Sequence, residues 1–176
     1  MIESFDDLNT LEQNWLTIAN EVADLPEDSI DVSWAKTRAQ AAEAVFKSGK
    51  MQWVEGWDGY KNWLAWGLVL DGEFLDGMPQ TRKLLENVRG LQFAAILNMR
   101  GCTIMRNHAH PENAGLLTYH LGLFVPEECY LKADGNFYQH ETGKGLIFDG
   151  TKPHYAFNAS GTDRFILHCE GAFYDN

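Results

Sequence analysis

Hydrophobic positions recur at steps of three and four residues near the start of the chain. Between residues 8 and 25 they form one amphipathic stripe, which predicts a helix that begins near residue 5 or near residue 11 and ends at Pro26. Thr10 and Gln13 offer a capping box for the later start. The stripe consists of Leu8, Leu11, Trp15, Ile18, Val22 and Leu25.

Residues that typically begin or end helices predict two further helices before residue 90. Ser33 is a candidate cap for a helix that reaches Lys47 and is stopped by Gly49. Pro79 suits a first helical turn and Gly90 a helix end, so a third helix is expected between them. The aromatic segment 53–66, WVEGWDGYKNWLAW, is interpreted as core and loop packing rather than as a binding platform.

After Gly90 the pattern changes to short apolar runs separated by turn signals. Seven or eight strands at this spacing, without helical segments between them, indicate an antiparallel sandwich or barrel. We therefore expect a mainly β protein with N-terminal helices, in which residues 91–176 form a jelly roll and residues 1–90 support it within one domain, 1–176. The runs are LQFAAILNM, GCTIM, GLLTYHLGLFV, CYLKA, FYQH, KGLIF, HYAFN and RFILHCEGAF.

Charge and composition narrow the possible partners. The formal net charge is −11, which argues against binding nucleic acid or anionic lipid, because both need clustered lysine and arginine. No apolar run is long enough to span a membrane, and the acidic start, MIESFDDLNT, lacks the features of a signal peptide. The three cysteines are widely spaced and form no CxxC pair, so we expect buried thiols and a cytoplasmic location.

The histidines suggest a metal site. All six follow residue 107, and His108 and His110 are two apart, so an extended backbone would direct both toward one point. His154 begins another apolar run after a turn, and strands distant in sequence pair closely in a jelly roll. Two or three neutral imidazoles would suit a first-row divalent metal: iron is plausible, and the ligand type does not exclude zinc or manganese. The alternative is that these are structural histidines at strand ends.

An arginine and another histidine could complete the site. Arg164 shares a strand face with Ile166 and His168, and an inward guanidinium would need an anionic partner such as a carboxylate ligand. Its alternative is a surface strand residue that pairs with Asp163 or Glu170. Thr118 and His120 share a face of another predicted strand, where the imidazole could donate to a second carboxylate; a hydrogen-bonded core histidine is the alternative for His120.

The segments NHAHPEN, HLGLFVP, GKGLIFDGTKPH and DRFIL, in this order over about residues 95–170, resemble the aspartyl/asparaginyl β-hydroxylase family of Fe(II)- and 2-oxoglutarate-dependent dioxygenases. The resemblance implies a double-stranded β-helix, the cupin-like form of the jelly roll. It implies that His108 and His154 bind Fe(II), that Arg164 holds the distal carboxylate of 2-oxoglutarate, and that His120 contacts the other end of this cosubstrate. At Thr118 the family usually has an arginine.

His110 stands where most iron and 2-oxoglutarate enzymes carry a carboxylate ligand, and where this family tends to leave the position to water. We hypothesise that His110 is a third nitrogen ligand. The other interpretations are a hydrogen-bond donor behind the ligands and a substrate contact.

Three functions are compatible with these residues. The first is a hydroxylase that uses molecular oxygen and 2-oxoglutarate on an amino-acid, Asp/Asn-like or other small carboxylate substrate, free or within a peptide. The second is a three-histidine, cupin-type dioxygenase without 2-oxoglutarate, in which Arg164 binds the substrate. The third is a non-catalytic, ligand-binding jelly roll. Among the remaining residues, we expect His140 to be exposed in a hairpin, His168 to lie satisfied in the core, and Asp149 to shape a turn.

Overall fold

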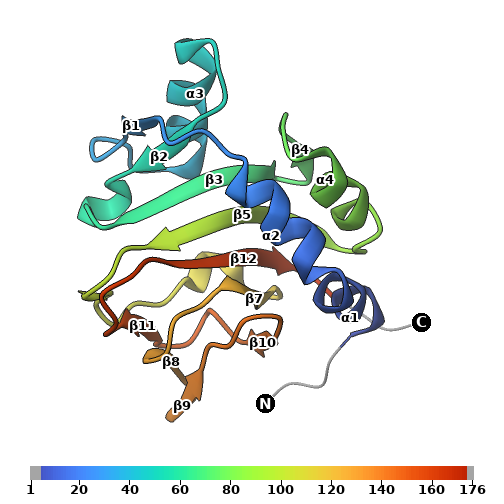
Figure 1. Cartoon of the computed structure of the whole chain (residues 1–176), viewed down its shortest axis with the longest axis vertical. Coiled ribbons are helices and arrows are strands. Elements are labelled where there is room, and N and C mark those ends of the chain that lie inside the picture. Colours follow the sequence, from blue (N-terminus) through green and yellow to red (C-terminus); the bar gives the residue numbers. More distant parts are fainter. Residues whose placement is uncertain (1–4, 174–176) are drawn as a thin grey trace.

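Two facing β-sheets make up most of the computed structural model, which describes residues 5–173. The larger sheet has the strand order β1-β2-β3-β5-β12-β7-β10, with β4 paired to β3, and the smaller has the order β6-β11-β8-β9 (Figure 1). This is the predicted mainly β, jelly-roll class of fold. The strands are β1 (Ser29–Asp31), β2 (Trp53–Glu55), β3 (Trp63–Leu70), β4 (Glu73–Phe74), β5 (Leu91–Met99), β6 (Thr103–Ile104), β7 (Leu117–Phe124), β8 (Cys129–Ala133), β9 (Asn136–Gln139), β10 (Gly145–Phe148), β11 (Tyr155–Asn158) and β12 (Arg164–Gly171).

The first amphipathic stripe forms two helices rather than one. They are α1 (Asp6–Gln13) and α2 (Trp15–Ala23), and they are separated at Asn14, whose φ of −108° and ψ of 18° are not helical. The Asn14 side chain donates to the Thr10 carbonyl at 2.8 Å, which satisfies an oxygen at the end of α1. The start near residue 5 is confirmed, but the capping box is wrong, because Thr10 lies inside α1.

The next two helices begin and end at different residues than expected. α3 (Arg38–Ser48) is capped by Thr37, whose hydroxyl accepts from the Gln40 N–H, and not by Ser33. Gly49 ends α3 as predicted, with a φ of 79°. α4 (Pro79–Leu85) starts at its proline but ends well before Gly90.

The first ninety residues also contain strands, which the hydrophobic pattern did not predict. β3 crosses the aromatic segment that was interpreted as core and loop, and it alternates: Leu64, Trp66 and Leu68 are buried in the main core. It pairs antiparallel with β5, and Trp63, Ala65 and Gly67 lie opposite Met99, Leu97 and Ala95. This pairing makes the front segment a continuation of the larger sheet.

The strands after residue 90 lie where the apolar runs predicted them, and β5 and β8 match their runs residue for residue. One face of the larger sheet packs against α1, α2 and α4 in the main hydrophobic core, which includes Leu11, Ile18, Ile96 and Leu167. The opposite face looks toward the smaller sheet and, over β3 and β5, toward α3. A cavity of about 570 Å³ opens on this second face, lined from both sheets and α3. None of the helices within residues 5–173 has the length and apolar character needed to cross a membrane.

Gly90 offers a test of the close approach between the start of β5 and the end of β12. It has a φ of 77°, and a Cβ there would lie 2.2 Å from the Ala172 carbonyl oxygen, whereas at Gly49, with a similar φ, nothing lies within 4 Å. We expect Gly90→Ala to lower the free energy of unfolding by about 3 kcal/mol, and Gly49→Ala by only about 1 kcal/mol, the cost of the left-handed backbone. Urea denaturation measures both, and equal losses would contradict the close approach.

Candidate metal centre and anion pocket

A short antiparallel bridge joins the two segments that carry the candidate metal ligands. The His108 N–H donates to the His154 carbonyl at 3.0 Å, and the His154 N–H donates to the His108 carbonyl at 2.9 Å. Paired residues of this kind project their side chains to the same side. The His110 N–H donates to the Gly150 carbonyl at 2.9 Å, which holds the same loop against the turn before β11.

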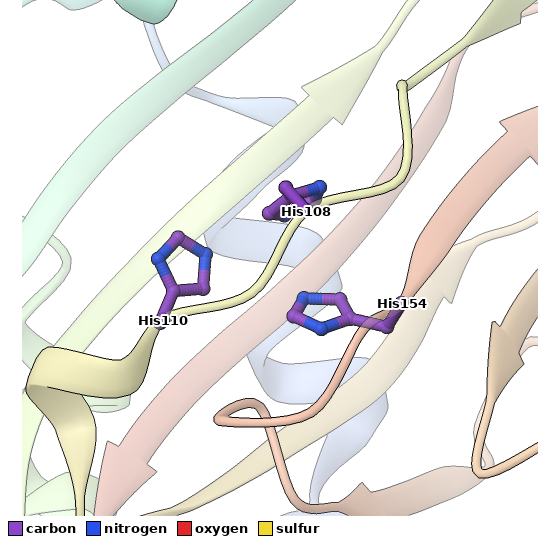
Figure 2. Close-up of side chains that lie close together, drawn as sticks. All are labelled: His108, His110 and His154. Carbon is purple, nitrogen blue, oxygen red and sulfur yellow. The ribbon is translucent and has the colours of Figure 1, made fainter.

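The bridge brings three imidazoles together. Figure 2 shows His108 and His110 on one segment facing His154 at the start of the other. One nitrogen from each ring lies within 4.8 Å of the others, and the ring centroids of His108 and His154 are 4.4 Å apart. Two nitrogens that bind one cation at about 2.1 Å can be at most ~4.2 Å apart, so the rings would turn slightly inward around a metal.

Hydrogen bonds leave the same nitrogen free on each ring. Nδ1 of His108 donates to the Arg106 carbonyl at 2.8 Å, and Nδ1 of His154 donates to the Lys152 carbonyl at 2.8 Å. Nδ1 of His110 lies 3.1 Å from a Glu112 carboxylate oxygen. Each Nε2 therefore keeps its lone pair for a metal, and the oxygen acceptors fix the ring orientation, as is usual behind metal-bound histidines. The donor set fits a first-row divalent ion such as Fe(II).

Burial keeps two of these imidazoles neutral. Desolvation lowers the pKa of His154 to about 4, and it also lowers the pKa of His108, with the neighbouring His110 adding to the effect. Neutral imidazole is the form that binds metals. Near pH 7 both rings are therefore ready to bind without first releasing a proton.

Arg164 lies in the cavity wall near the histidines and is 1% exposed. Among residues 5–173 its Nε has no partner, while its Nη1 lies 3.5 Å from Nδ1 of His140. Desolvation lowers the pKa of Arg164 to about 10, so the guanidinium stays charged near pH 7. The acids expected as alternative partners are engaged elsewhere: Asp163 with Asn98, and Glu170 with Arg38. Because a buried, unpaired cation is costly, the arrangement fits a carboxylate ligand.

A chain of hydrogen bonds runs from Arg164 through the buried His140 and His120 and the half-buried His168 to Glu170. It links Nη1 of Arg164 to Nδ1 of His140, Nε2 of His140 to Nδ1 of His120 at 3.2 Å, Nε2 of His120 to Nδ1 of His168 at 2.9 Å, and Nε2 of His168 to Glu170 at 2.9 Å. A guanidinium only donates and a carboxylate only accepts. Every imidazole between them is therefore assigned as neutral with its proton on Nε2, and all the bonds run in one direction.

The electrostatics support this assignment. Desolvation lowers the pKa values of His120 and His140 well below the usual range, and adjacent cationic groups, including Arg164, lower them further. Burial also lowers the pKa of His168. Desolvation would raise the pKa of Glu170, but hydrogen bonds from His168 and Arg38 outweigh it and bring the pKa well below the usual value.

Glu170 is a site residue that was not predicted from the sequence. It accepts two hydrogen bonds from Arg38 at 2.7 Å each, one from His168, and one from the Asn113 amide at 2.9 Å. It lies on β12 at the next alternate position after Arg164, Ile166 and His168, so strand alternation could have identified it. Arg38 comes from α3, with its guanidinium 3.9 Å from the Phe93 ring centroid, and no local pattern marks it.

Three expectations about the site change. His140 is 3% exposed and is not in an exposed hairpin. Its N–H donates to the Cys129 carbonyl, and its ring is part of the hydrogen-bond chain that begins at Arg164. His120 lines the cavity, but both of its ring nitrogens are engaged, so neither is free to donate to a carboxylate. Thr118 is buried beside Gly150 rather than in the cavity wall.

The remaining expectations have mixed outcomes. His168 is satisfied by hydrogen bonds, as expected, and it also lines the cavity. Asp149 shapes a turn, as expected, by accepting from the Thr151 N–H and hydroxyl. Cys129 and Cys169 are buried thiols, whereas Cys102 is exposed.

The family model described as Aspartyl/Asparaginyl beta-hydroxylase matches residues 12–172. The chain belongs to this family. A relative from Rhizobium tropici, an ornithine lipid ester-linked acyl 2-hydroxylase, is 32% identical over 92 residues, which are 51% of this chain and 32% of that protein. The chain thus matches about a third of the length of this hydroxylase.

Solved structures with some likeness include the cupin domain of an XRE family transcriptional regulator from Enterobacter cloacae and KdgF from Halomonas sp. The first is 16% identical with a TM-score of 0.45, over 62% of this chain and 96% of that chain. The second is 8% identical with a TM-score of 0.47, over 70% of this chain and 87% of that chain. These scores are too low to bear on function.

Removal of one imidazole tests the metal centre. We expect His110→Ala to weaken binding of Co(II), a spectroscopic probe for such sites, by about tenfold to a hundredfold, since one of three nitrogen donors is lost. Isothermal titration and the visible d–d spectrum measure this. Glu127→Gln, which changes an exposed acid outside the cavity lining, is the control and should bind within a few-fold of the original chain. Unchanged affinity and an unchanged spectrum in His110→Ala would exclude ligation by His110.

The buried histidines make stability depend on pH. Their folded-state pKa values are lowered, so below about pH 6.5 the unfolded chain binds more protons than the folded one. The free energy of unfolding should therefore be highest above this pH and should fall between pH 6.5 and 5 by more than ~1.4 kcal/mol per pH unit, the slope for one proton. Urea denaturation in the presence of EDTA measures it. His140→Gln should have a shallower slope, and a flat profile for the original chain would contradict burial of neutral imidazoles.

Proposed function

We propose that the chain is an Fe(II)- and 2-oxoglutarate-dependent oxygenase that hydroxylates a carbon of a small-molecule or peptide substrate. The observation that carries the proposal is the buried guanidinium of Arg164, which has no carboxylate partner among the described residues and lines the same cavity as the three histidines. A cation site next to a carboxylate site suits a cosubstrate with both a metal-chelating and an anionic end. Membership of a hydroxylase family supports the reaction class.

In this function the chain binds and orients its cofactors. His108, His154 and His110 would hold Fe(II) through Nε2, and Arg164 would hold the distal carboxylate of 2-oxoglutarate. When bound, these groups supply oxygen activation in the overall reaction in which substrate C–H, O₂ and 2-oxoglutarate yield alcohol, succinate and CO₂. The buried histidine chain fixes the direction of the Arg164 hydrogen bond, so the charge is oriented before a ligand arrives.

A second function is favoured by the third imidazole. With His110 in the ligand set, the centre has three nitrogen donors, as expected for a cupin-type dioxygenase that does not use 2-oxoglutarate. In that case Arg164 would bind a carboxylate of the substrate itself. Succinate formation separates the two functions, because only the first consumes 2-oxoglutarate.

Binding of 2-oxoglutarate to the iron-loaded chain tests the proposal. Under anaerobic conditions, Fe(II) with 2-oxoglutarate should produce a weak visible charge-transfer band that saturates. Arg164→Met, which keeps much of the length of the side chain but removes its charge, should weaken 2-oxoglutarate binding at least tenfold, because a buried carboxylate would lose its partner. Arg100→Met changes an exposed arginine just after β5 and is the control. A band of the same strength and affinity in Arg164→Met, or no band in the original chain, would contradict the proposal.

A further inference from the structure

The cavity extends well beyond the metal centre. From the three histidines it continues along the shared face of β3 and β5, beneath α3, to Leu70 and Leu75. Along β3 the lining residues run from Trp63 to Leu70. We call this extension the α3 cleft. It follows one strand direction, and its volume lies within the total of about 570 Å³.

Small and aliphatic side chains line the α3 cleft. Each wall contributes residues on one face: the floor comes from alternate positions of β3 and β5, and the roof comes from successive turns of α3. The alanine side chains leave room between helix and sheet, where larger ones would pack together and close it. At Gly67 the Leu75 side chain packs against the strand, since a Cβ there would lie 2.9 Å from Leu75 Cδ1. These lining residues are Ala65 and Gly67 on β3, Phe93, Ala95 and Leu97 on β5, and Ala41, Ala42 and Val45 on α3.

Buried charges in the cleft are already paired. Glu170 accepts four hydrogen bonds, from Arg38, His168 and Asn113, so its carboxylate has no remaining site for an ammonium group. The other acids that line the cavity, Asp58, Asp71 and Glu112, are exposed at its edge. A free amino acid would need a buried anionic partner for its α-ammonium group, and the described lining residues offer none.

We propose that the α3 cleft binds an unbranched acyl chain and presents a carbon of that chain to the metal centre. The aliphatic walls of the cleft and its lack of an available buried acid among the described residues match a hydrocarbon chain, and each buried CH₂ group would contribute favourably. The oxidation of this chain rests on the function proposed above. Binding of the acyl chain in the cleft does not rest on that function, because binding needs neither iron nor 2-oxoglutarate.

Two alanines of α3 provide a matched test. Ala42 lines the cleft, whereas Ala44 is half-buried on the same helix and lines a separate shallow depression with Ile30 and Trp34. Octanoate, laurate and palmitate are titrated into the metal-free chain by calorimetry, with L-aspartate as the polar comparison. We expect affinity to rise from octanoate to palmitate, no measurable binding of L-aspartate, and at least a tenfold loss of palmitate affinity in Ala42→Trp. Ala44→Trp should bind like the original chain.

A second variant and a folding measurement control for the possibility that Ala42→Trp misfolds. Ala65→Leu fills the cleft from the opposite wall and should weaken palmitate binding in the same direction, while thermal melting shows whether each variant is folded. Equal palmitate affinity in folded Ala42→Trp and the original chain, or binding of L-aspartate in place of the fatty acids, would overturn the proposal.

The outcome also separates this inference from the proposed function. If acyl chains bind in the cleft but no acyl compound stimulates succinate release, the result contradicts the proposed oxygenase function and supports the acyl-chain assignment of the cleft. If L-aspartate stimulates succinate release and fatty acids do not bind, the oxygenase function remains and the acyl-chain assignment fails.

Discussion

The pair of backbone hydrogen bonds between His108 and His154 is the contact on which the candidate site depends. It joins the loop that leaves β6 to the first residue before β11, two segments that are far apart in the sequence. Backbone bonds of this kind fix the direction of both side chains, so two imidazoles meet without any interaction between the rings themselves. His110 joins them because its own backbone N–H is tied to Gly150 in the neighbouring turn. The metal centre is thus built by main-chain geometry, and the side chains supply the donor atoms.

Behind this centre, the protein holds two opposite charges at the ends of a row of neutral histidines. Arg164 and Glu170 lie on the same strand, β12, six residues and about 20 Å apart, so they cannot pair directly. His140, His120 and His168 connect them in the hydrogen-bond chain. Glu170 is satisfied by Arg38 from α3, which leaves Arg164 without a carboxylate in the part of the chain that the structure describes. This separation of charge is costly in a buried region and is consistent with a site kept ready for an anion. The same contact between Arg38 and Glu170 anchors the first turn of α3 over the cavity.

Much of the fold could be predicted because strand runs and turn residues act locally. The runs LQFAAILNM and CYLKA became β5 and β8 without a shift, since their boundaries are set by adjacent turns. β3 was missed because its aromatic residues and its isolated Gly67 obscured a real alternation, which is stabilised mainly by pairing with β5. The first helix broke at Asn14 because that side chain bonds to the backbone one turn earlier, an interaction that hydrophobic spacing does not report.

The sequence by itself determined the mainly β class, the two histidine segments and the strand that carries Arg164, because periodicity and turn chemistry are properties of neighbouring residues. Only the tertiary structure decided what these residues contact. His140 is buried and not exposed, because β8 pairs with the residue before it and its ring fits between His120 and Arg164. Arg38 reaches Glu170 because α3 folds over the extended sheet, and that placement opens the apolar cleft. These features depend on contacts between distant segments, which local patterns do not encode.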